Sequence, residues 1–225
     1  MTHGSHGEPV AGAISRLAAQ AIEGPAGPLE ALLQEREGIE PLITAVVCHP
    51  HPLYGGTMHN KVVHRVASVL HGFGVSVLRF NFRGTGKSAG AHDRGAGELD
   101  DANAALDWMR ARHPHARPWL AGFSFGSWIA ARLAAQSPQV ERLILIAPPI
   151  RTSSFSDLHD CTTPKLVIQG TADDICPPEL LHQEFPRWAD PKKLVLVPDA
   201  THFFDRKLGE MAEALEAAIR EQAWM

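Results

Sequence analysis

From residue 42 onward, short uninterrupted runs of apolar residues alternate with segments whose apolar residues recur every three or four positions. Uninterrupted apolar runs are typical of parallel strands that are buried on both faces of a sheet. The segments between them have the spacing of amphipathic helices. A chain that alternates in this way joins parallel strands through crossover helices. The sequence therefore predicts the α/β class, with a mostly parallel central sheet covered by helices on both faces.

The element boundaries follow from turn residues and helix-capping residues. Residues 16–36 contain two predicted strands around the Gly-Pro-Ala-Gly turn at 24–27. No helix separates these strands, so we place them as an antiparallel pair at one edge of the sheet. The glycine- and histidine-rich residues 1–13 are expected to be flexible, and residues 14–225 to form one domain. We expect the other strands at 42–50, 75–84, 117–122, 142–149, 165–170 and 193–198, and helices at 60–74, 98–114, 124–136 and 208–222.

The composition excludes several classes of partner. The chain has 225 residues, a net charge of −4 and no basic run, so neither nucleic acid nor an anionic membrane is expected to bind. No segment approaches the roughly 18 apolar residues of a membrane helix, and residues 1–20 lack a signal-peptide run. We therefore expect a cytoplasmic protein. Cys48, Cys161 and Cys176 have no paired spacing and are expected to be reduced thiols.

Two patterns resemble ligand sites but fail on spacing. The chain has 13 histidines, yet its histidines and cysteines show neither CxxC nor HExxH spacing, so we expect no metal. Residues 83–90, "RGTGKSAG", end like a phosphate-binding loop, but Asn81 stands where that pattern needs a glycine. No nucleotide or other cofactor is therefore expected.

The stretch "LAGFSFGSWIA", residues 120–130, places a serine where a predicted strand meets a predicted helix. Gly122-x-Ser124-x-Gly126 is the pattern of a strand-to-helix elbow that carries a nucleophilic serine. The two glycines leave room where a side chain would collide with a neighbouring strand or helix. The helix N-terminus that follows favours the negative charge of a reacting oxyanion. Ser124 is therefore the candidate nucleophile; the alternative is a serine that only caps the helix.

A serine hydroxyl needs a base, and the base needs a carboxylate to hold its tautomer. In proteins with such an elbow, the acid and the histidine follow the serine in that order along the chain. "TADDICPP" follows the strand at 165–170, and Asp173 is the candidate acid, with Asp174 as the alternative. "DATHFF" follows the last strand, and His202 is the candidate base. Parallel strands end at one sheet edge, so the three side chains are expected to meet there.

Acyl transfer also needs two N–H donors for the oxyanion. One is expected from Phe125, the residue after the nucleophile. The other is expected from the loop "CHPHPLYGGTMHN", where Pro50 and Pro52 carry no N–H. His51 is the preferred donor and Leu53 the alternative. Tyr54, the single tyrosine, lies in the same loop and is a candidate for substrate contact.

These motifs, in this order along the chain, resemble those of the α/β-hydrolase superfamily. The segments "HPHPLYGGTMHNKV", "VLRFNFRGTGKSAG", "GFSFGS", "GTADDICP" and "DATHFF" carry the resemblance. More narrowly, the chain is similar to small bacterial hydrolases of the dienelactone-hydrolase-like group. That group implies a Ser124–Asp173–His202 triad and esterase-type activity. Dienelactone hydrolase itself uses a cysteine nucleophile, whereas this chain has Ser124.

These residues predict that the protein is a serine hydrolase. The preferred hypothesis is a carboxylesterase that acts on small to medium esters. A thioesterase, lactonase or amidase with the same triad stays open, as does a non-catalytic binding protein of the same fold. Only "PPIRTSSFSDLHDCTTP" separates two late strands, where many relatives carry a helical cap, so we expect an open crevice. A small-molecule substrate is expected, with a monomer or a weak homodimer that uses Trp224. Aromatic candidates for the pocket wall are Tyr54, Phe123, Phe125, Phe155 and Phe203.

Overall fold

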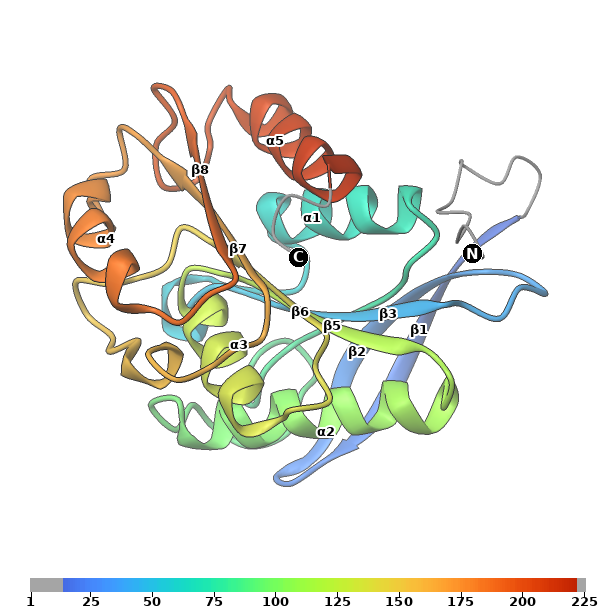
Figure 1. The fold of residues 1–225 in the computed structure, drawn as a ribbon. Coiled ribbons are helices and arrows are strands. Elements are labelled where there is room, and N and C mark those ends of the chain that lie inside the picture. Colours follow the sequence, from blue (N-terminus) through green and yellow to red (C-terminus); the bar gives the residue numbers. More distant parts are fainter. Residues whose placement is uncertain (1–13, 222–225) are drawn as a thin grey trace.

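An eight-stranded sheet runs through the centre of the computed structural model, which describes residues 14–221 (Figure 1). The strands are β1 (Ser15–Gly24), β2 (Gly27–Arg36), β3 (Ile43–Cys48), β4 (Ser76–Phe80), β5 (Arg117–Phe123), β6 (Arg142–Ile146), β7 (Lys165–Gly170) and β8 (Lys192–Val197). Their order is β1-β2-β4-β3-β5-β6-β7-β8. Strands β3 to β8 are parallel, whereas β2 pairs antiparallel with both β1 and β4. The predicted parallel sheet with an antiparallel N-terminal edge is confirmed.

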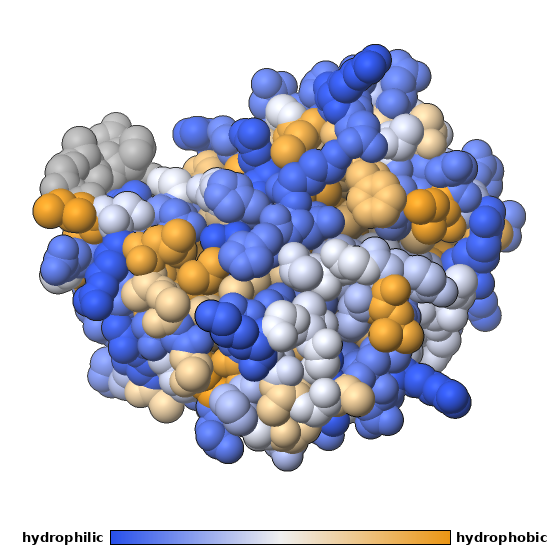
Figure 2. All heavy atoms as spheres, turned by 180° about the vertical axis from the view of Figure 1, so that it is seen from behind, coloured by the Kyte–Doolittle hydropathy of each residue, from blue (hydrophilic) through white to orange (hydrophobic). Residues whose placement is uncertain are grey.

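Two helices cover each face of the sheet. Helices α1 (Lys61–Gly72) and α5 (Leu208–Glu221) pack together on one face, and α2 (Ala96–Arg112) and α3 (Phe125–Gln136) on the other (Figure 1). A shorter helix, α4 (Pro178–Glu184), lies between β7 and β8 in the chain. The face of the molecule seen in Figure 2 is largely hydrophilic with separate apolar patches. Among residues 14–221, no helix has the length and apolar character needed to cross a membrane.

Strand β6 shows why the sequence has uninterrupted apolar runs. Its residues 143–146 are all buried. Leu143 and Leu145 pack into the apolar cluster under α2 and α3, whereas Ile144 and Ile146 pack into the cluster under α1 and α5. Consecutive side chains of a strand point to opposite faces. A central strand with helices on both sides therefore needs apolar residues at adjacent positions.

Several predicted boundaries are wrong by one to four residues, such as that of the strand predicted at 142–149, which ends at Ile146. Two of these differences have a clear local reason. Strand β4 ends at Phe80 instead of residue 84, because the N–H groups of Phe82 and Arg83 donate to side chains instead of a neighbouring strand: to His49 Nε2 (3.0 Å) and Asp101 Oδ2 (2.9 Å). Helix α2 begins at Ala96, two residues before the predicted start at 98. The Glu98 carboxylate accepts the N–H of the residue before the helix (2.7 Å) and so caps it.

The connection between β6 and β7 carries no cap. Within residues 147–164 the structure has only a single 3₁₀ turn, Ser156–Leu158. The expected α/β-hydrolase fold without a cap domain is therefore confirmed. The carboxyl ends of the central strands remain open to solvent at the edge where the sequence predicts its site. The residues 1–13 that we expect to be flexible, and Trp224, lie outside the described residues.

The packing of α5 gives a test of the core. Leu215 in α5 is fully buried, whereas Leu196 in β8 is 39% exposed. Leu215→Ala is expected to lower the free energy of unfolding by about 2–5 kcal/mol, because it leaves a cavity. Leu196→Ala makes the same chemical change at the surface and is expected to cost less than about 1 kcal/mol. Urea unfolding followed by circular dichroism measures both, and equal losses would contradict this placement of α5.

Candidate active site

Ser124 lies at the turn between β5 and α3. Its backbone has φ of 52°, a positive value that residues other than glycine rarely adopt. The Ser124 N–H donates to the Ile146 carbonyl (2.9 Å), and the Ser124 carbonyl accepts the Ser127 N–H (2.8 Å). The neighbouring strand and the first helical turn thus hold this conformation, which is a kind of strain that clusters at functional sites.

The glycines on either side of the serine are required by close backbone contacts. A Cβ atom at Gly122 would lie 2.2 Å from the Gly126 carbonyl oxygen. A Cβ atom at Gly126 would lie 2.3 Å from the Cys48 carbonyl oxygen and 2.5 Å from that of His49. The start of α3 therefore packs directly on the backbone at the end of β3.

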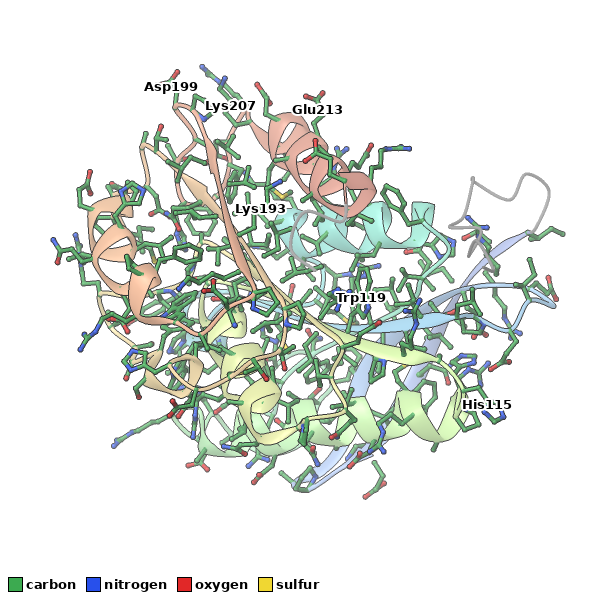
Figure 3. All side chains as sticks on the ribbon, in the orientation of Figure 1. His115, Trp119, Lys193, Asp199, Lys207 and Glu213 are labelled. Atoms are coloured by element: carbon green, nitrogen blue, oxygen red, sulfur yellow. The ribbon has the colours of Figure 1, made fainter. Side chains whose placement is uncertain are left out.

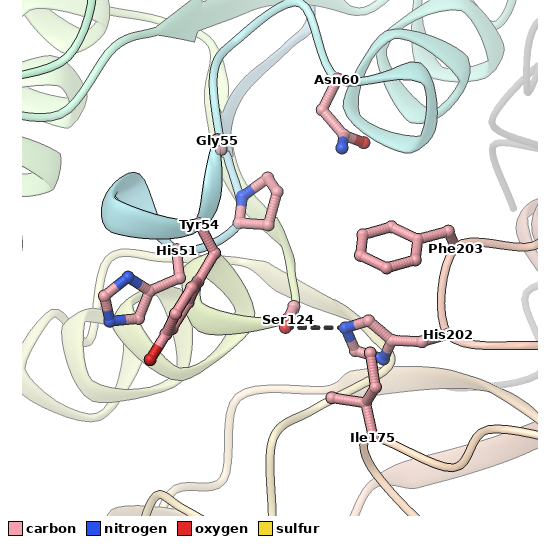
Figure 4. Close-up of a pocket in the computed structure, with 10 residues that line it drawn as sticks. His51, Tyr54, Gly55, Asn60, Ser124, Ile175, His202 and Phe203 are labelled. Atoms are coloured by element: carbon pink, nitrogen blue, oxygen red, sulfur yellow. Dashed lines mark hydrogen bonds between the residues drawn. The ribbon is translucent and has the colours of Figure 1, made fainter.

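The three side chains that the sequence singles out meet at the carboxyl edge of the sheet. Ser124 Oγ lies 3.0 Å from His202 Nε2, a contact drawn as a dashed line in Figure 4. His202 Nδ1 lies 2.9 Å from Asp173 Oδ2. His202 and Asp173 are only 3% and 2% exposed. The structure thus brings serine, imidazole and carboxylate into one hydrogen-bonded chain.

The hydrogen bonds of Asp173 fix the tautomer of the histidine. Asp173 Oδ1 accepts the backbone N–H groups of Ile175 (3.0 Å) and Cys176 (2.7 Å), and Oδ2 accepts from Gln169 Nε2 (2.9 Å). A carboxylate surrounded by donors acts as an acceptor, so His202 Nδ1 carries the proton toward it. His202 Nε2 is then free to accept the Ser124 hydroxyl proton.

The loops that carry the acid and the imidazole are tied to each other. The Ala172 N–H donates to the Ala200 carbonyl (3.0 Å), and the Asp199 N–H donates to Thr171 Oγ1 (2.8 Å). The Asp199 side chain itself is exposed at the loop tip (Figure 3). These bonds set the distance between two loops that belong to different strands.

The two backbone N–H groups that the sequence predicts as oxyanion donors are free in the described structure. Within residues 14–221, neither the Phe125 N–H at the start of α3 nor the His51 N–H after β3 has a hydrogen-bond partner. The Leu53 N–H, by contrast, donates to His51 Nδ1 (3.2 Å). The geometry therefore favours His51 over Leu53. It likewise favours Asp173 over Asp174, which is exposed.

A pocket of about 170 Å³ opens beside Ser124 (Figure 4). Tyr54 and Phe203, 87% and 41% exposed, stand at its mouth. Burial lowers the pKa of the His51 imidazole, and the neighbouring His92 lowers that pKa further, so the ring is neutral at pH 7. The lining therefore has no permanently charged side chain. It consists of Pro50, His51, Tyr54, Gly55, Gly56, Asn60, Ser124, Ile175, His202 and Phe203.

Known proteins share both this fold and much of this sequence. An α/β serine hydrolase without a lid from Xanthomonas campestris is 42% identical, with a TM-score of 0.84 over 92% of this chain and 94% of that one. An α/β serine hydrolase homologue from Coxiella burnetii is 40% identical, with a TM-score of 0.86 over 90% and 97%. The sequence profile of the serine aminopeptidase family S33 matches residues 43–156. The chain belongs to the S33 family of α/β hydrolases.

An uncharacterised protein of Rickettsia prowazekii is also similar to this α/β hydrolase. The two are 39% identical over 180 residues, which is 76% of each chain. The lidless architecture of this α/β hydrolase agrees with that of the Xanthomonas protein. The narrower resemblance to the dienelactone-hydrolase-like group stays a prediction.

The prediction that five aromatic residues line the pocket is only partly right. Tyr54 and Phe203 line the pocket of this α/β hydrolase, but Phe123, Phe125 and Phe155 do not. The Phe123 ring lies 5.2 Å from that of His202 and supports it from the buried side. Phe155 is 2% exposed and stacks on a core tryptophan instead.

Sequence reasoning missed three side chains of the site. Asn60, the N-cap of α1, and Ile175, in the acid loop, line the pocket. Gln169 is buried and binds Asp173 from behind. Asn60 had a usable signal, because an asparagine before a helical run is a typical N-cap at the start of a helix. No local pattern marks Ile175 or Gln169.

One group in the described part of the chain has the spacing of metal ligands. Atoms of Asp173, Cys176 and His202 lie within 4.8 Å of one another. Burial raises the pKa of the Cys176 thiol to about 12, and the Asp173 charge adds to this rise, so the thiol stays protonated at neutral pH. The carboxylate and the imidazole are already bonded to each other. These donors do not fit a metal ion.

The close contact at Gly126 gives a sharp test of the elbow. Gly126→Ala is expected to lower the free energy of unfolding by about 1–3 kcal/mol or more, because the new methyl group meets backbone that cannot move aside. Gly209→Ala in α5 is the matched control, since a Cβ there meets nothing within 4 Å. We expect that control to be neutral or stabilising by up to about 1 kcal/mol. Thermal unfolding compares the two, and a stable Gly126→Ala protein would show that the elbow is looser than described.

Proposed function

We propose that the protein is a metal-independent carboxylesterase that cleaves small to medium esters through a Ser124–His202–Asp173 triad and an acyl-enzyme. The observation that carries the proposal is the continuous hydrogen-bonded chain from Ser124 Oγ through His202 to Asp173. A serine, an imidazole and a buried carboxylate in this arrangement form the constellation used for acyl transfer on several unrelated folds.

In the first step, Ser124 Oγ attacks the ester carbonyl carbon while His202 Nε2 takes the hydroxyl proton. The carbonyl π electrons move to oxygen and form a tetrahedral oxyanion. Asp173 holds the Nδ1–H of the imidazole and stabilises the imidazolium that forms. The N–H groups of Phe125 and His51 bind the oxyanion, where each donor is worth far more than in water.

Collapse of the tetrahedral intermediate breaks the bond to the leaving alkoxide. His202 returns its proton to that oxygen, and the alcohol departs past Ile175 and Phe203 at the pocket mouth. Water then repeats the sequence: His202 takes one of its protons, the hydroxide oxygen attacks the acyl carbon, and Ser124 recovers its hydrogen as the acid leaves. Each turnover consumes one ester and one water and yields one alcohol and one carboxylic acid.

The pocket favours uncharged substrates. None of its lining side chains is permanently charged, and its volume of about 170 Å³ suits a short acyl group. The family profile is named for serine aminopeptidases, whose substrates carry a free ammonium group. No aspartate or glutamate lines this pocket to pair with an ammonium. An ester therefore fits the site better than an amino-terminal peptide bond.

Ser124 should be the one residue that an active-site serine probe modifies. A fluorophosphonate is expected to label the native protein and to leave Ser124→Ala unlabelled. Asp173→Asn should lose about 10⁴-fold in kcat, because the imidazole adopts the wrong tautomer. It should also be less stable than the wild type, because the new amide NH2 faces the Gln169 donor that Asp173 Oδ2 accepts. Mass spectrometry locates the label, and hydrolysis of a p-nitrophenyl ester gives kcat. Absence of label, or equal label on Ser124→Ala, would refute the mechanism.

A panel of substrates tests which type of bond the protein cleaves and which acyl groups it accepts. We expect the highest kcat/KM for uncharged esters with short to medium acyl chains. A succinyl half-ester should be at least about tenfold poorer, because the lining offers no partner for its carboxylate. A thioester, lactone or aminoacyl amide that outperforms the best ester would replace the ester in this proposal. Binding of these compounds without turnover would instead indicate a non-catalytic binding protein.

A further inference from the structure

His49, directly after β3, bonds two separate backbone segments through its two ring nitrogens. Nε2 lies 3.0 Å from the Phe82 backbone nitrogen, in the loop after β4. Nδ1 lies 2.6 Å from the Pro50 carbonyl oxygen, in the loop after β3. The side chain is completely buried. The buried His49 ring therefore connects the loop after β3 to the loop after β4, and it lies two residues before His51 in the chain.

The two bonds allow one protonation state. A backbone N–H can only donate, so Nε2 of His49 must accept from Phe82. Nδ1 therefore carries the ring proton and donates it to the Pro50 carbonyl. Burial lowers the pKa of the His49 imidazole to about 4, so this neutral tautomer persists throughout the neutral range.

The Pro50 carbonyl belongs to the peptide group whose nitrogen is that of His51. A peptide group is planar, with its C=O and N–H pointing in opposite directions. A bond that holds the oxygen toward the His49 ring therefore directs the His51 N–H away from that ring. His51 itself lines the pocket.

The same peptide group is held from a second side by Gly56. A Cβ atom at Gly56 would lie 2.0 Å from the Pro50 oxygen and 2.7 Å from the His51 oxygen, so the two backbone segments are in direct contact. The Gly56 N–H also donates to the His51 carbonyl (3.1 Å). The peptide between residues 50 and 51 is thus clamped between the imidazole and a glycine.

We propose that His49 is a positioning residue that sets the direction of the His51 N–H in the oxyanion hole, an inference that rests on the proposed esterase function. His49 does not touch the substrate. It acts by holding the plane of one peptide group, and it links that group to the loop after β4.

The test compares His49→Phe with His49→Gln. Phenylalanine fills the space but removes both bonds, whereas the glutamine amide can accept from Phe82 and donate to Pro50. For His49→Phe we expect kcat to fall about 10- to 100-fold with KM within about threefold, since removal of a whole oxyanion donor costs about 10²–10³. His49→Gln should recover most of this loss.

The inhibition constant of a trifluoromethyl ketone distinguishes a positioning role of His49 from a purely structural one. The ketone forms a hemiketal oxyanion with the serine, so its inhibition constant should weaken by the same factor as kcat/KM. The control is Leu215→Ala, which destabilises the distant core. Fluorophosphonate titration corrects every rate for the concentration of competent sites, and the control should then match the wild type in kcat and ketone affinity.

The outcomes separate this inference from the function on which it rests. If the wild type hydrolyses esters and binds the ketone, and His49→Phe does both equally well, the positioning role is wrong. Corrected losses of equal size in His49→Phe and Leu215→Ala would also overturn it. A wild-type protein that neither hydrolyses esters nor binds the ketone would contradict the esterase function itself, and with it this role.

Discussion

The contact between the start of α3 and the end of β3 is the constraint on which the site depends. At Gly126 the helix backbone lies so near the Cys48 and His49 carbonyls that only a glycine fits. This contact fixes the serine elbow against the segment that leads to His51, the proposed second oxyanion donor. The backbone of Ser124 and the two N–H groups proposed as donors are therefore parts of one packed unit.

Asp173 and His202 are held in place by hydrogen bonds. Asp173 is buried, and a buried carboxylate is stable only when its oxygens are satisfied. Two backbone N–H groups, Gln169 and His202 supply those bonds. The carboxylate is thus held from its own loop, and the bond from Ala172 to Ala200 brings the imidazole loop to it. The charge that orients His202 is also a structural element of the fold.

The sequence predicted what depends on the order of elements and missed what depends on their packing. Parallel strands end at one edge, so three side chains that follow such strands could be expected to meet before any distance was known. Ser124, Asp173 and His202 do meet there. The residues that line the pocket could not be predicted in this way. Phe155 and Phe203 look alike in the sequence, yet one is 2% exposed and the other 41%. Burial of an aromatic ring is decided by tertiary neighbours, and no local pattern reports them.

The loop after β3, which carries the proposed donor His51, is bonded and packed on several sides, and the described chain has no cap over the site. Enzymes with lids exclude water and complete their sites by closing over the substrate. An open site lacks that step, so its donors must already point at the developing charge before the substrate arrives. The loop after β3 is built accordingly: Pro50 and Pro52 limit its conformations, Gly56 packs against it, and His49 bonds it to the next loop. In this α/β hydrolase, the fold itself thus holds the loop in one conformation, as a site without a closing lid would require.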